Sequence, residues 1–353
     1  MGFALCRDST CIMTILKFEF SGYKALSPRL FNIHASLLRG ICVEREIIEL
    51  FMEHLNNQGD LPLGDDAGAL KLGEEWLVAT NDMLVKSTDV PEIMTPEQVG
   101  FKVFTMNVSD VAAMGGKPVG FLFSLGVPKS IDMDYLEGIA KGIAKASEFY
   151  STPVISADTN EACDLIIDGI AIGKTKRLLT RSGAKEGDLV CVTGDVGRAL
   201  AGLKVYFENL EVSERTRKAL YEKLLEPKAR LREGQILSRY ANAAIDISDG
   251  MSKELHLIAN MSRVRMMIDA ERLPIREEVF EVAELLGIDP VSIALASGEE
   301  FELIFTIPEE HAKKLDFEFS IIGRVERGEG VYLRRNGKLE RMPLLGWEHL
   351  AKP

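Results

Sequence analysis

Hydrophobic residues recur along most of this chain with the spacings typical of amphipathic helices and buried strands. Between 44 and 57, apolar residues at positions 47, 48, 50, 51 and 55 form one helical stripe. The segment 95–98, Thr-Pro-Glu-Gln, supplies a capping hydroxyl, a proline for the first turn and a glutamine three residues after the cap. We therefore expect a second helix that begins near Pro96, continues to about Met114 and ends at the glycines 115–116.

Short apolar runs elsewhere predict strands, and longer amphipathic runs predict further helices. Strands are expected at 76–80, 119–127, 154–157, 165–173, 189–193, 243–247, 301–307 and 319–325. Further helices are expected at 132–150, 197–209, 229–240 and 252–262. The dipeptide Asn336-Gly337 is typical of a tight hairpin turn. This order predicts two halves of similar size, each built from strands and helices as in an α/β or α+β protein.

The chain length supports a division into two domains, because 353 residues exceed what one ordinary small domain contains. The polar, glycine-containing run 174–188 is the best candidate for the connection between them. We therefore expect an N-terminal domain over 44–180 and a C-terminal domain over 181–353. Residues 1–43 have no clear hydrophobic period, and we treat them as an extension to which the pattern assigns no structure.

Composition and charge exclude several classes of protein. Hydrophobic residues make up 46% and charged residues 27% of the chain, which is ordinary for a globular protein and excludes a disordered or collagen-like one. The formal net charge of −12 repels a phosphate backbone, so general nucleic-acid binding is not expected. No stretch approaches the ~18 uninterrupted apolar residues that a membrane span needs. The five cysteines lack C-x-x-C spacing, which predicts reduced thiols and a cytoplasmic location.

Acidic residues recur beside the predicted strand ends and turns. They are Asp65 and Asp66 in a glycine turn, Asp82 after the strand at 76–80, Asp158 at the end of the strand at 154–157, Asp246 on the strand at 243–247, and Asp249 where the next helix starts. For each of these alone, a role in a turn or a helix cap is the simpler interpretation. Asp110 differs, because it lies inside a predicted helix and shares a face with Val103 and Met114. A carboxylate on such an apolar face is unfavourable unless it is paired or bound to a metal.

Taken together, the acidic residues predict a magnesium site. The strand ends of one sheet meet at one edge, where α/β proteins commonly bind ligands. The aspartates expected there are Asp65, Asp82, Asp110, Asp158, Asp246 and Asp249. Such a group would not fully ionise without a countercharge, and oxygen ligands without neighbouring Cys or His favour Mg²⁺ before Zn²⁺. Because substrate phosphates commonly complete the coordination of Mg²⁺ held by carboxylates, a phosphate-bearing substrate is expected.

Other motifs for phosphate binding or acid–base catalysis are weak. The segment 169–175 is one residue short of the spacing of a P-loop, and its Ile-Ala-Ile interior is typical of a strand. The glycine turn at 193–197 is expected to serve packing rather than phosphate binding. No G-x-G-x-x-G fingerprint is present, and the five histidines lie outside every motif, so a histidine base has little support.

Several motifs follow one another in a distinctive order. They are Gly64-Asp65-Asp66-Ala67, Asn81-Asp82-Met83-Leu84-Val85, Asn107-Val108-Ser109-Asp110-Val111-Ala112-Ala113-Met114-Gly115, Ala157-Asp158-Thr159, Arg181-Ser182-Gly183-Ala184-Lys185-Glu186-Gly187-Asp188, Asp246-Ile247-Ser248-Asp249-Gly250, Gly298-Glu299-Glu300-Phe301-Glu302-Leu303 and Gly346-Trp347-Glu348-His349. This ordered set resembles the thiamine-monophosphate kinases, which belong to the superfamily that includes aminoimidazole ribonucleotide synthetase. One motif would be a weak signal, but the full set is highly specific and covers the chain from about Glu44 to His349.

The resemblance implies a fold and a reaction. The fold would be the two-domain α/β architecture of the aminoimidazole ribonucleotide synthetase superfamily, with a C-terminal α/β sandwich and N-terminal sheets that pair into a barrel across a homodimer. The reaction would be the direct in-line transfer of the γ-phosphoryl group of ATP to thiamine phosphate in the presence of several Mg²⁺ ions. Because a phosphate monoester has a second pKa of about 6, the acceptor is largely dianionic at pH 7 and needs no general base.

The resemblance also implies residue roles, motif by motif. Mg²⁺ ions would be held by Asp65, Thr80, Asn81, Asp82, Asp110, Asp158, Asp246 and Asp249, with Asn81 acting through its backbone. ATP would contact Asp158, Arg181 and Ser248. The catalytic residues would be Asp110, Asp158 and Asp249. Glu299 and Trp347 would line the thiamine side, where the indole suits a cationic ring.

One position departs from the family pattern. Many members have a histidine a few residues after the Asp82 motif that contacts the substrate, whereas this chain has the sequence Lys-Ser-Thr-Asp at 86–89. Asp89 occupies the aligned substrate position, and a carboxylate is a poor partner for a phosphate. We therefore expect Lys86 or another basic residue to take over the contact with the substrate phosphate.

Two alternatives remain open from the sequence. The first is another ATP-dependent enzyme similar to aminoimidazole ribonucleotide synthetase, which shares the acidic ATP site. The second is a catalytically idle protein that binds ATP and Mg²⁺ in a regulatory role. The complete aspartate set argues against the second alternative, and the departure at Asp89 keeps it open.

Overall fold

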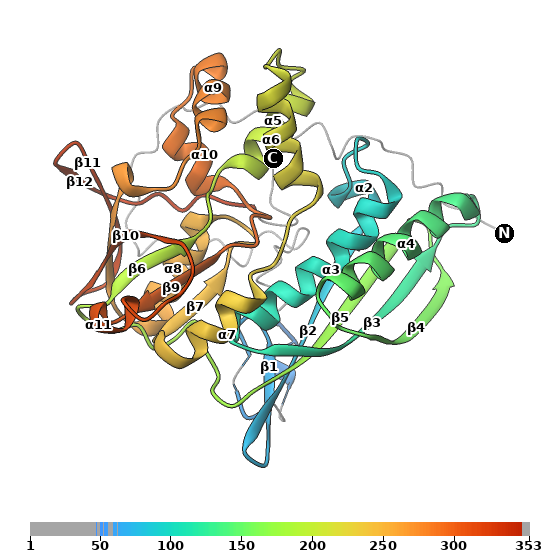
Figure 1. Ribbon diagram of the computed structural model, residues 1–353, viewed down its shortest axis with the longest axis horizontal. Helices are drawn as coiled ribbons and strands as arrows, with labels where there is room; N and C mark the ends of the chain where they lie inside the picture. Colours follow the sequence, from blue (N-terminus) through green and yellow to red (C-terminus); the bar gives the residue numbers. More distant parts are fainter. Residues whose placement is uncertain (1–46, 48–49, 52, 56–58, 62, 348–353) are drawn as a thin grey trace, which may run out of the picture.

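The described part of the chain forms two sheets, each with its own helices (Figure 1). A computed structural model describes residues 47, 50–51, 53–55, 59–61 and 63–347. The extension at 1–43 lies outside these residues, and the helix expected at 44–57 lies partly outside them. None of the described helices combines the length and the apolar composition needed to span a lipid bilayer.

The N-terminal sheet has five strands in the order β1-β2-β5-β3-β4, and only β3 and β4 run parallel to each other. Its strands are β1 (Gly68–Leu72), β2 (Glu75–Val85), β3 (Lys117–Val127), β4 (Val154–Glu161) and β5 (Ile166–Thr175). The helices of this unit are α2 (Lys86–Asp89), α3 (Pro96–Ala113) and α4 (Met133–Phe149). Helix α3 packs on one face of the sheet, where the ring of Phe104 stacks on that of Phe121 with centroids 4.1 Å apart.

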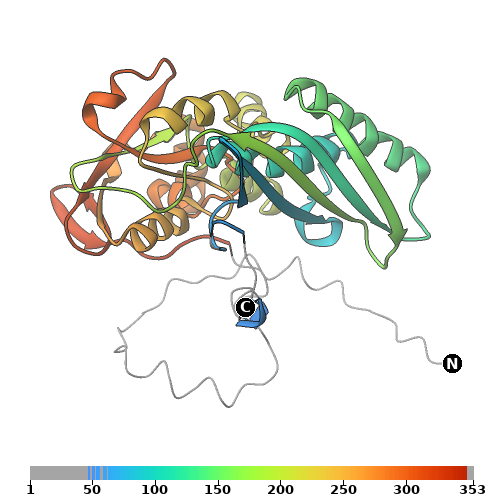
Figure 2. The ribbon, with the colours of Figure 1, turned by 90° about the horizontal axis from the view of Figure 1, so that it is seen from below.

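Two glycines let α4 lie very close to α3. A Cβ on Gly142 would be 1.9 Å from the carbonyl oxygen of Glu97, and a Cβ on Gly100 would be 2.1 Å from that of Ile139. Because no side chain fits at such distances, both positions require glycine. Figure 2 shows the sheet from its other face, which no described helix covers.

The C-terminal sheet has seven strands in the order β12-β11-β8-β10-β6-β9-β7. Its strands are β6 (Leu189–Thr193), β7 (Ala243–Asp246), β8 (Arg265–Asp269), β9 (Leu303–Ile307), β10 (Phe319–Glu326), β11 (Gly330–Arg335) and β12 (Lys338–Arg341). The helices of this unit are α5 (Arg198–Phe207), α6 (Glu214–Leu225), α7 (Leu231–Tyr240), α8 (Met251–Ser262), the 3₁₀ helix η3 (Ala270–Arg272), α9 (Glu277–Leu286), α10 (Pro290–Ala296) and α11 (Glu309–Ala312). Alternate residues of β6 and β9 pack into two different cores, so the centre of this sheet is buried on both faces.

Helix α3 joins the two units. A Cβ on Gly234 of α7 would be 2.1 Å from the carbonyl oxygen of Ala112 on α3, so the two helices touch through their backbones. Ser109 of α3 donates a hydrogen bond of 2.5 Å to the carboxylate of Asp246 on β7. One side of α3 therefore faces its own sheet, and another side faces the C-terminal unit.

Several local predictions are confirmed. The Thr95 hydroxyl accepts a hydrogen bond from the backbone N–H of Gln98 at 3.3 Å, and the Gln98 side chain accepts one from the Thr95 N–H at 3.0 Å. Asn336 and Gly337 form the turn between β11 and β12, with φ angles of 49° and 75°. Of the connection expected at 174–188, residues 176–188 lie between the two sheets, whereas Lys174 and Thr175 still belong to β5. The expected α/β architecture with two units is also confirmed.

Two strand ends near the expected site were predicted wrongly. Strand β2 continues to Val85, although an end at position 80 was expected, and β4 continues to Glu161 rather than ending at 157. Both strands extend through polar residues because the neighbouring strands pair with their backbone groups. The pattern also missed α6, α9, α10, β1 and β8, which are short or rich in charge.

Candidate active site

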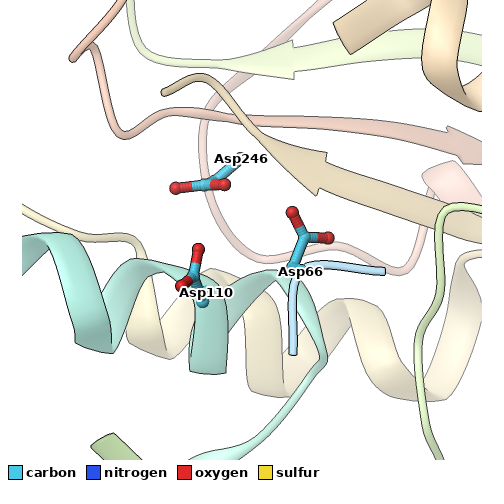
Figure 3. Close-up of side chains that lie close together, drawn as sticks. All are labelled: Asp66, Asp110 and Asp246. Atoms are coloured by element: carbon cyan, nitrogen blue, oxygen red, sulfur yellow. The ribbon is translucent and has the colours of Figure 1, made fainter. Parts of the chain in front are cut away.

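Three buried aspartates form an acidic cluster at the junction of the two units (Figure 3). Asp66 lies in the loop before β1, Asp110 lies on α3, and Asp246 is the last residue of β7. Carboxylate oxygens of the three residues lie within 4.8 Å of one another. We call these three residues the acidic cluster.

Hydrogen bonds from α3 and β2 hold two members of the cluster in place. The Thr80 hydroxyl on β2 donates to Asp110 Oδ2 at 2.5 Å, and the Ser109 hydroxyl donates to Asp246 Oδ2 at 2.5 Å. Asp110 and Ser109 are adjacent on α3, so one helix supports both carboxylates. The expectation that Asp110 has a role other than capping agrees with this position inside the helix.

The electrostatics of the acidic cluster call for a cation. Burial raises the pKa of Asp110 well above its usual range, and the charges of Asp82, Asp246 and Asp66 raise it further. Burial also raises the pKa of Asp246, with Asp66 as the next contribution. The buried Asp66 Oδ2 has no hydrogen-bond partner. An unpartnered oxygen facing two further carboxylates, without a Cys or His in the group, fits a hard divalent cation such as Mg²⁺.

Arg181 binds the loop that carries two of the aspartates. Its Nη2 donates to Asp66 Oδ1 at 2.8 Å, its Nη1 donates to the carbonyl of Gly64 at 3.1 Å, and its backbone N–H donates to Asp65 Oδ1 at 3.0 Å. Burial opposes the charge of the guanidinium, but the carboxylate of Asp66 outweighs it, so the pKa of Arg181 is raised. Burial raises the pKa of Asp65 to about 6, with a further contribution from Asp66.

Asp66 is the member of the cluster that the sequence prediction did not select. Asp65 was chosen as the metal ligand from this turn, and its role as a ligand stays a prediction. The structure instead brings the neighbouring Asp66 to Asp110 and Asp246. The double aspartate in a glycine turn was the available signal, but only the path of the loop determines which of the two faces inward.

Asp82 lies inside β2 beside the acidic cluster rather than after a strand. Its backbone N–H donates to the side chain of Asn107 on α3 at 3.1 Å, and its charge contributes to the raised pKa of Asp110. Asn81 precedes it on the strand, so its side chain points to the opposite face of the sheet. The expected metal contact of Asn81 through its backbone does not depend on that side chain.

Asp158 does not join the acidic cluster within one chain. On the neighbouring strand β3, Ser124 is the register partner of Asp158 and also of Asp168 on β5. Asp158 and Asp168 therefore lie on the same face of the sheet. The next residue, Gly169, faces α3, because a Cβ there would be 2.3 Å from the Asn107 amide. Successive residues of a strand point to opposite faces, so Asp158 lies on the face turned away from α3. The expected convergence of all six aspartates on one edge is therefore wrong for Asp158.

The segment that carries Ser248 and Asp249 lies beside the expected thiamine side. The backbone N–H of Glu299 donates to the carbonyl of Ser248 at 2.7 Å, and that of Trp347 donates to the carbonyl of Asp249 at 2.7 Å. Residues that are far apart in the sequence therefore meet at this segment, which follows directly after Asp246.

Asp249 is not the cap of α8, although the next helix was expected to start there. The cap position is Gly250, and the Asp249 carboxylate forms an ion pair with Lys253. The Asp249 backbone N–H donates to the buried carboxylate of Glu254 at 3.1 Å. Burial raises the pKa of Glu254 to about 8, with a further contribution from Asp249.

Asp89 is the last residue of α2, and its carboxylate is used within the chain. It accepts a hydrogen bond from the backbone N–H of Val85 at 2.7 Å. The backbone carbonyl of Asp89 accepts a hydrogen bond of 3.2 Å from Lys102 on α3. Lys102 also forms an ion pair of 2.5 Å with Glu299. Lys102 was not among the residues singled out from the sequence, although a basic residue was expected near this position.

Comparison with known proteins gives consistent matches over both units. The family description "AIR synthase related protein, N-terminal domain" matches residues 64–175, and "AIR synthase related protein, C-terminal domain" matches residues 185–336. A protein of Pyrococcus horikoshii named thiamine-monophosphate kinase is 56% identical over 87% of this chain and 96% of its own length. A protein of the same name from Aquifex aeolicus is 35% identical over 81% of this chain and 92% of its own length.

A solved structure matches the fold as a whole. It is described as AaThiL complexed with AMPPCP and TMP, and it has a TM-score of 0.80 and 34% sequence identity. The match covers 87% of this chain and 97% of that one. The similarity therefore extends over both units of the present chain.

Proposed function

The chain belongs to the thiamine-monophosphate kinase family, and from this premise we propose that it transfers the γ-phosphoryl group of ATP to thiamine phosphate. The products are thiamine diphosphate and ADP. The observation that carries the proposal is the acidic cluster with its unpartnered Asp66 oxygen, because it lies at the junction between the two units and beside the segment 246–250. The similar structure named for AMPPCP and TMP supports the same pair of substrates.

The site needs positioning and charge neutralisation more than acid–base chemistry. Thiamine phosphate is a phosphate monoester with a second pKa of about 6, so it is largely dianionic at pH 7 and is already a nucleophile. The main obstacle is the repulsion between the phosphate of the acceptor and the phosphates of ATP, and catalysis of phosphoryl transfer depends mainly on reducing this repulsion. Among the described residues, His256 and His311 each contact a backbone carbonyl of a helix and have no place in the site.

Magnesium ions fit the donor set, and several residues would hold them. The residues proposed for this role are Asp66 from the geometry, and Asp65, Thr80, Asn81, Asp82, Asp110, Asp158, Asp246 and Asp249 from the family pattern. When bound, Mg²⁺ neutralises phosphoryl oxygens and stabilises the charge of the transition state. Asp110, Asp158 and Asp249 are the residues proposed as catalytic, and Asp158, which lies on the opposite face of its sheet, would act at the site of a second copy that covers this face.

The remaining substrate contacts are also assigned by proposal. Arg181 and Ser248 would contact ATP together with Asp158, and Arg181 contributes a positive charge that is fixed by its bonds to the 64–66 loop. Glu299 and Trp347 would line the thiamine side, and Asp89 would lie near the substrate. The transfer would be direct and in line. A stable phosphorylated form of the protein during turnover would contradict it.

We also propose that the protein is a homodimer whose N-terminal sheets face each other. No described helix covers the sheet face turned away from α3 (Figure 2). Exposed apolar side chains lie on this face. Met83 is 57% exposed and Ile155 is 54% exposed. A second copy that covered this face would also approach Asp158, which lies on it. The domain boundary near 180 and the cytoplasmic location stay predictions from the sequence.

One assay tests the function against its alternatives. Purified protein is incubated with ATP and Mg²⁺ and, in separate tubes, with thiamine phosphate, free thiamine or formylglycinamidine ribonucleotide. We expect thiamine diphosphate in the first tube alone. Turnover with the ribonucleotide would indicate an activity like that of aminoimidazole ribonucleotide synthetase, and ATP binding without turnover in any tube would indicate an idle regulatory protein.

A further inference from the structure

A buried lysine connects the two units beside the expected thiamine side. Lys102 is on α3 and its side chain is 1% exposed, whereas the side chain of its ion-pair partner Glu299 is 35% exposed. The Lys102 ammonium lies 2.5 Å from Glu299 Oε1 and donates to the carbonyl of Asp89 at 3.2 Å. One ammonium group thus joins α3, the end of α2 and the loop 297–302.

The loop that carries Glu299 has an unfavourable backbone and is held from the C-terminal side. Glu299 and Phe301 have φ angles of 55° and 48°, a region that non-glycine residues rarely adopt. The buried Glu300 accepts hydrogen bonds of 2.7 Å from the backbone N–H of Gly197 and from the Ser297 hydroxyl. The buried Glu302 accepts from Lys223 at 2.6 Å. Both neighbouring glutamates therefore make these contacts inside the C-terminal unit, where Lys223 also lies 3.5 Å from Glu300 Oε2.

Glu299 is the glutamate of this loop that reaches the N-terminal unit. A buried ammonium is stable only with a charged or strongly polar partner, so the ion pair fixes where the Glu299 carboxylate lies. Its partial exposure leaves that carboxylate accessible from outside. Lys102 itself is covered, which favours an indirect role over contact with the substrate.

The same helix carries the acidic cluster's Asp110. Lys102 and Asp110 are eight residues apart on α3, which corresponds to about 12 Å along the helix axis. A rigid helix therefore sets the distance between the Glu299 carboxylate and the acidic cluster. A substrate with a cationic ring at one end and a phosphate at the other would have to match that distance.

We propose that Lys102 is a positioning residue for thiamine phosphate, which acts by holding the Glu299 carboxylate where the cationic ring of the substrate binds. This inference rests on the proposed function and adds a residue to it. Lys102 determines the affinity for thiamine phosphate through Glu299 and does not contact the substrate phosphate.

A double-mutant cycle tests the proposal. The variants are Lys102→Met, Glu299→Gln and the double variant, and the readouts are KM for each substrate and the calorimetric Kd for thiamine phosphate. We expect Lys102→Met to raise KM and Kd for thiamine phosphate roughly tenfold. The KM for ATP should stay within about twofold, because the nucleotide site is untouched. In the Glu299→Gln background, Lys102→Met should cause little further increase in KM or Kd for thiamine phosphate.

Additional variants separate positioning from general damage. Lys102→Arg keeps the charge and should restore most of the affinity. If Lys102→Met does not fold, Lys102→Gln, which also removes the charge, replaces it in the cycle. Lys145→Met is the matched control, because Lys145 on α4 forms an exposed ion pair with Glu97, which lies on α3 like Lys102. It should leave both KM values unchanged.

Two results would overturn the proposal. One is an equal effect of Lys102→Met with and without Glu299, which would indicate an independent contact with the substrate. The other is an unchanged affinity for thiamine phosphate in Lys102→Met. The Kd is measured without turnover, so it tests the proposal separately from the proposed function. A wild-type protein that binds thiamine phosphate but forms no thiamine diphosphate would refute the proposed function, and the Kd values of the cycle would still test the role of Lys102.

Discussion

Arg181 Nη2 lies 2.8 Å from Asp66 Oδ1, and this contact ties the segment between the two sheets to the acidic cluster. The guanidinium also donates to the carbonyl of Gly64, so it fixes the loop on which Asp66 stands. The Arg181 Nε is buried without a partner. The contact therefore positions a carboxylate and keeps a positive charge close to the expected phosphates.

Replacing Arg181 tests this double role. We expect Arg181→Met to lower kcat/KM for ATP by about 10- to 100-fold, the range seen when residues that orient metal ligands are removed. Arg181→Lys should recover only part of the loss, because an ammonium lacks the planar fork that binds both Asp66 and Gly64. Steady-state kinetics with varied ATP is the measurement. Arg239→Met, at an exposed position, is the control, and equal activity of Arg181→Met and the control would contradict the role.

Removing the charge of Asp110 should separate metal binding from stability. Asp110→Asn is expected to lower turnover on the order of 1,000-fold, because it removes a ligand from the acidic cluster. In EDTA the same variant should have a Tm equal to or above that of the wild type, since it removes one of several repelling buried carboxylates. Thermal unfolding with and without Mg²⁺ is the measurement. If Mg²⁺ raises the Tm of the variant as much as it raises the Tm of the wild type, Asp110 is not a ligand.

The buried Glu302 should make a pH-dependent contribution to stability. Burial alone would raise its pKa, but Lys223 and Arg230 outweigh burial and hold it below the ordinary value of 4.5. Glu302 therefore stabilises the fold fully above the unfolded-state pKa, and this contribution is lost as the pH falls through the folded-state pKa.

Glu302→Gln is expected to lower the free energy of unfolding by about 3 kcal/mol at pH 7, because Lys223 and Arg230 lose their carboxylate. The difference from the wild type should narrow below pH ~4.3, where Glu302 begins to be protonated in the unfolded wild type. Urea unfolding of both proteins at several pH values measures this difference in the free energy of unfolding. A difference that stays constant from pH 7 to pH 3 would show that the charge of Glu302 is not the cause.

The bare face of the N-terminal sheet should be a dimer interface. We expect Ile155→Glu to convert the protein from a dimer to a monomer, because a charge on the apolar face opposes its burial. Light scattering coupled to size-exclusion chromatography measures the mass. Leu339→Glu, on the exposed strand β12 of the other unit, should leave the mass unchanged. A wild-type protein that is monomeric at micromolar concentration would refute the interface.

Local signals predicted the parts of the fold that local chemistry stabilises. The capping box at Thr95 sets the start of α3, and the Asn336-Gly337 pair sets the hairpin, because both depend on residues within a few positions. Asp110 was identified as unusual because a carboxylate inside a helix has no capping role. The ordered motifs indicated the family, and the comparisons confirm it.

The sequence by itself determined the fold class, the family and the acidic character of the site, because these follow from composition, spacing and motif order. Only the tertiary structure decided that Asp66 faces Asp110 and Asp246, that Asp158 lies on the opposite face of the sheet, and that Lys102 meets Glu299. The physical reason is that these relations depend on strand length, register and the packing of α3 between the two units. A shift of one residue in a strand reverses the face of every side chain, and no local pattern encodes that choice.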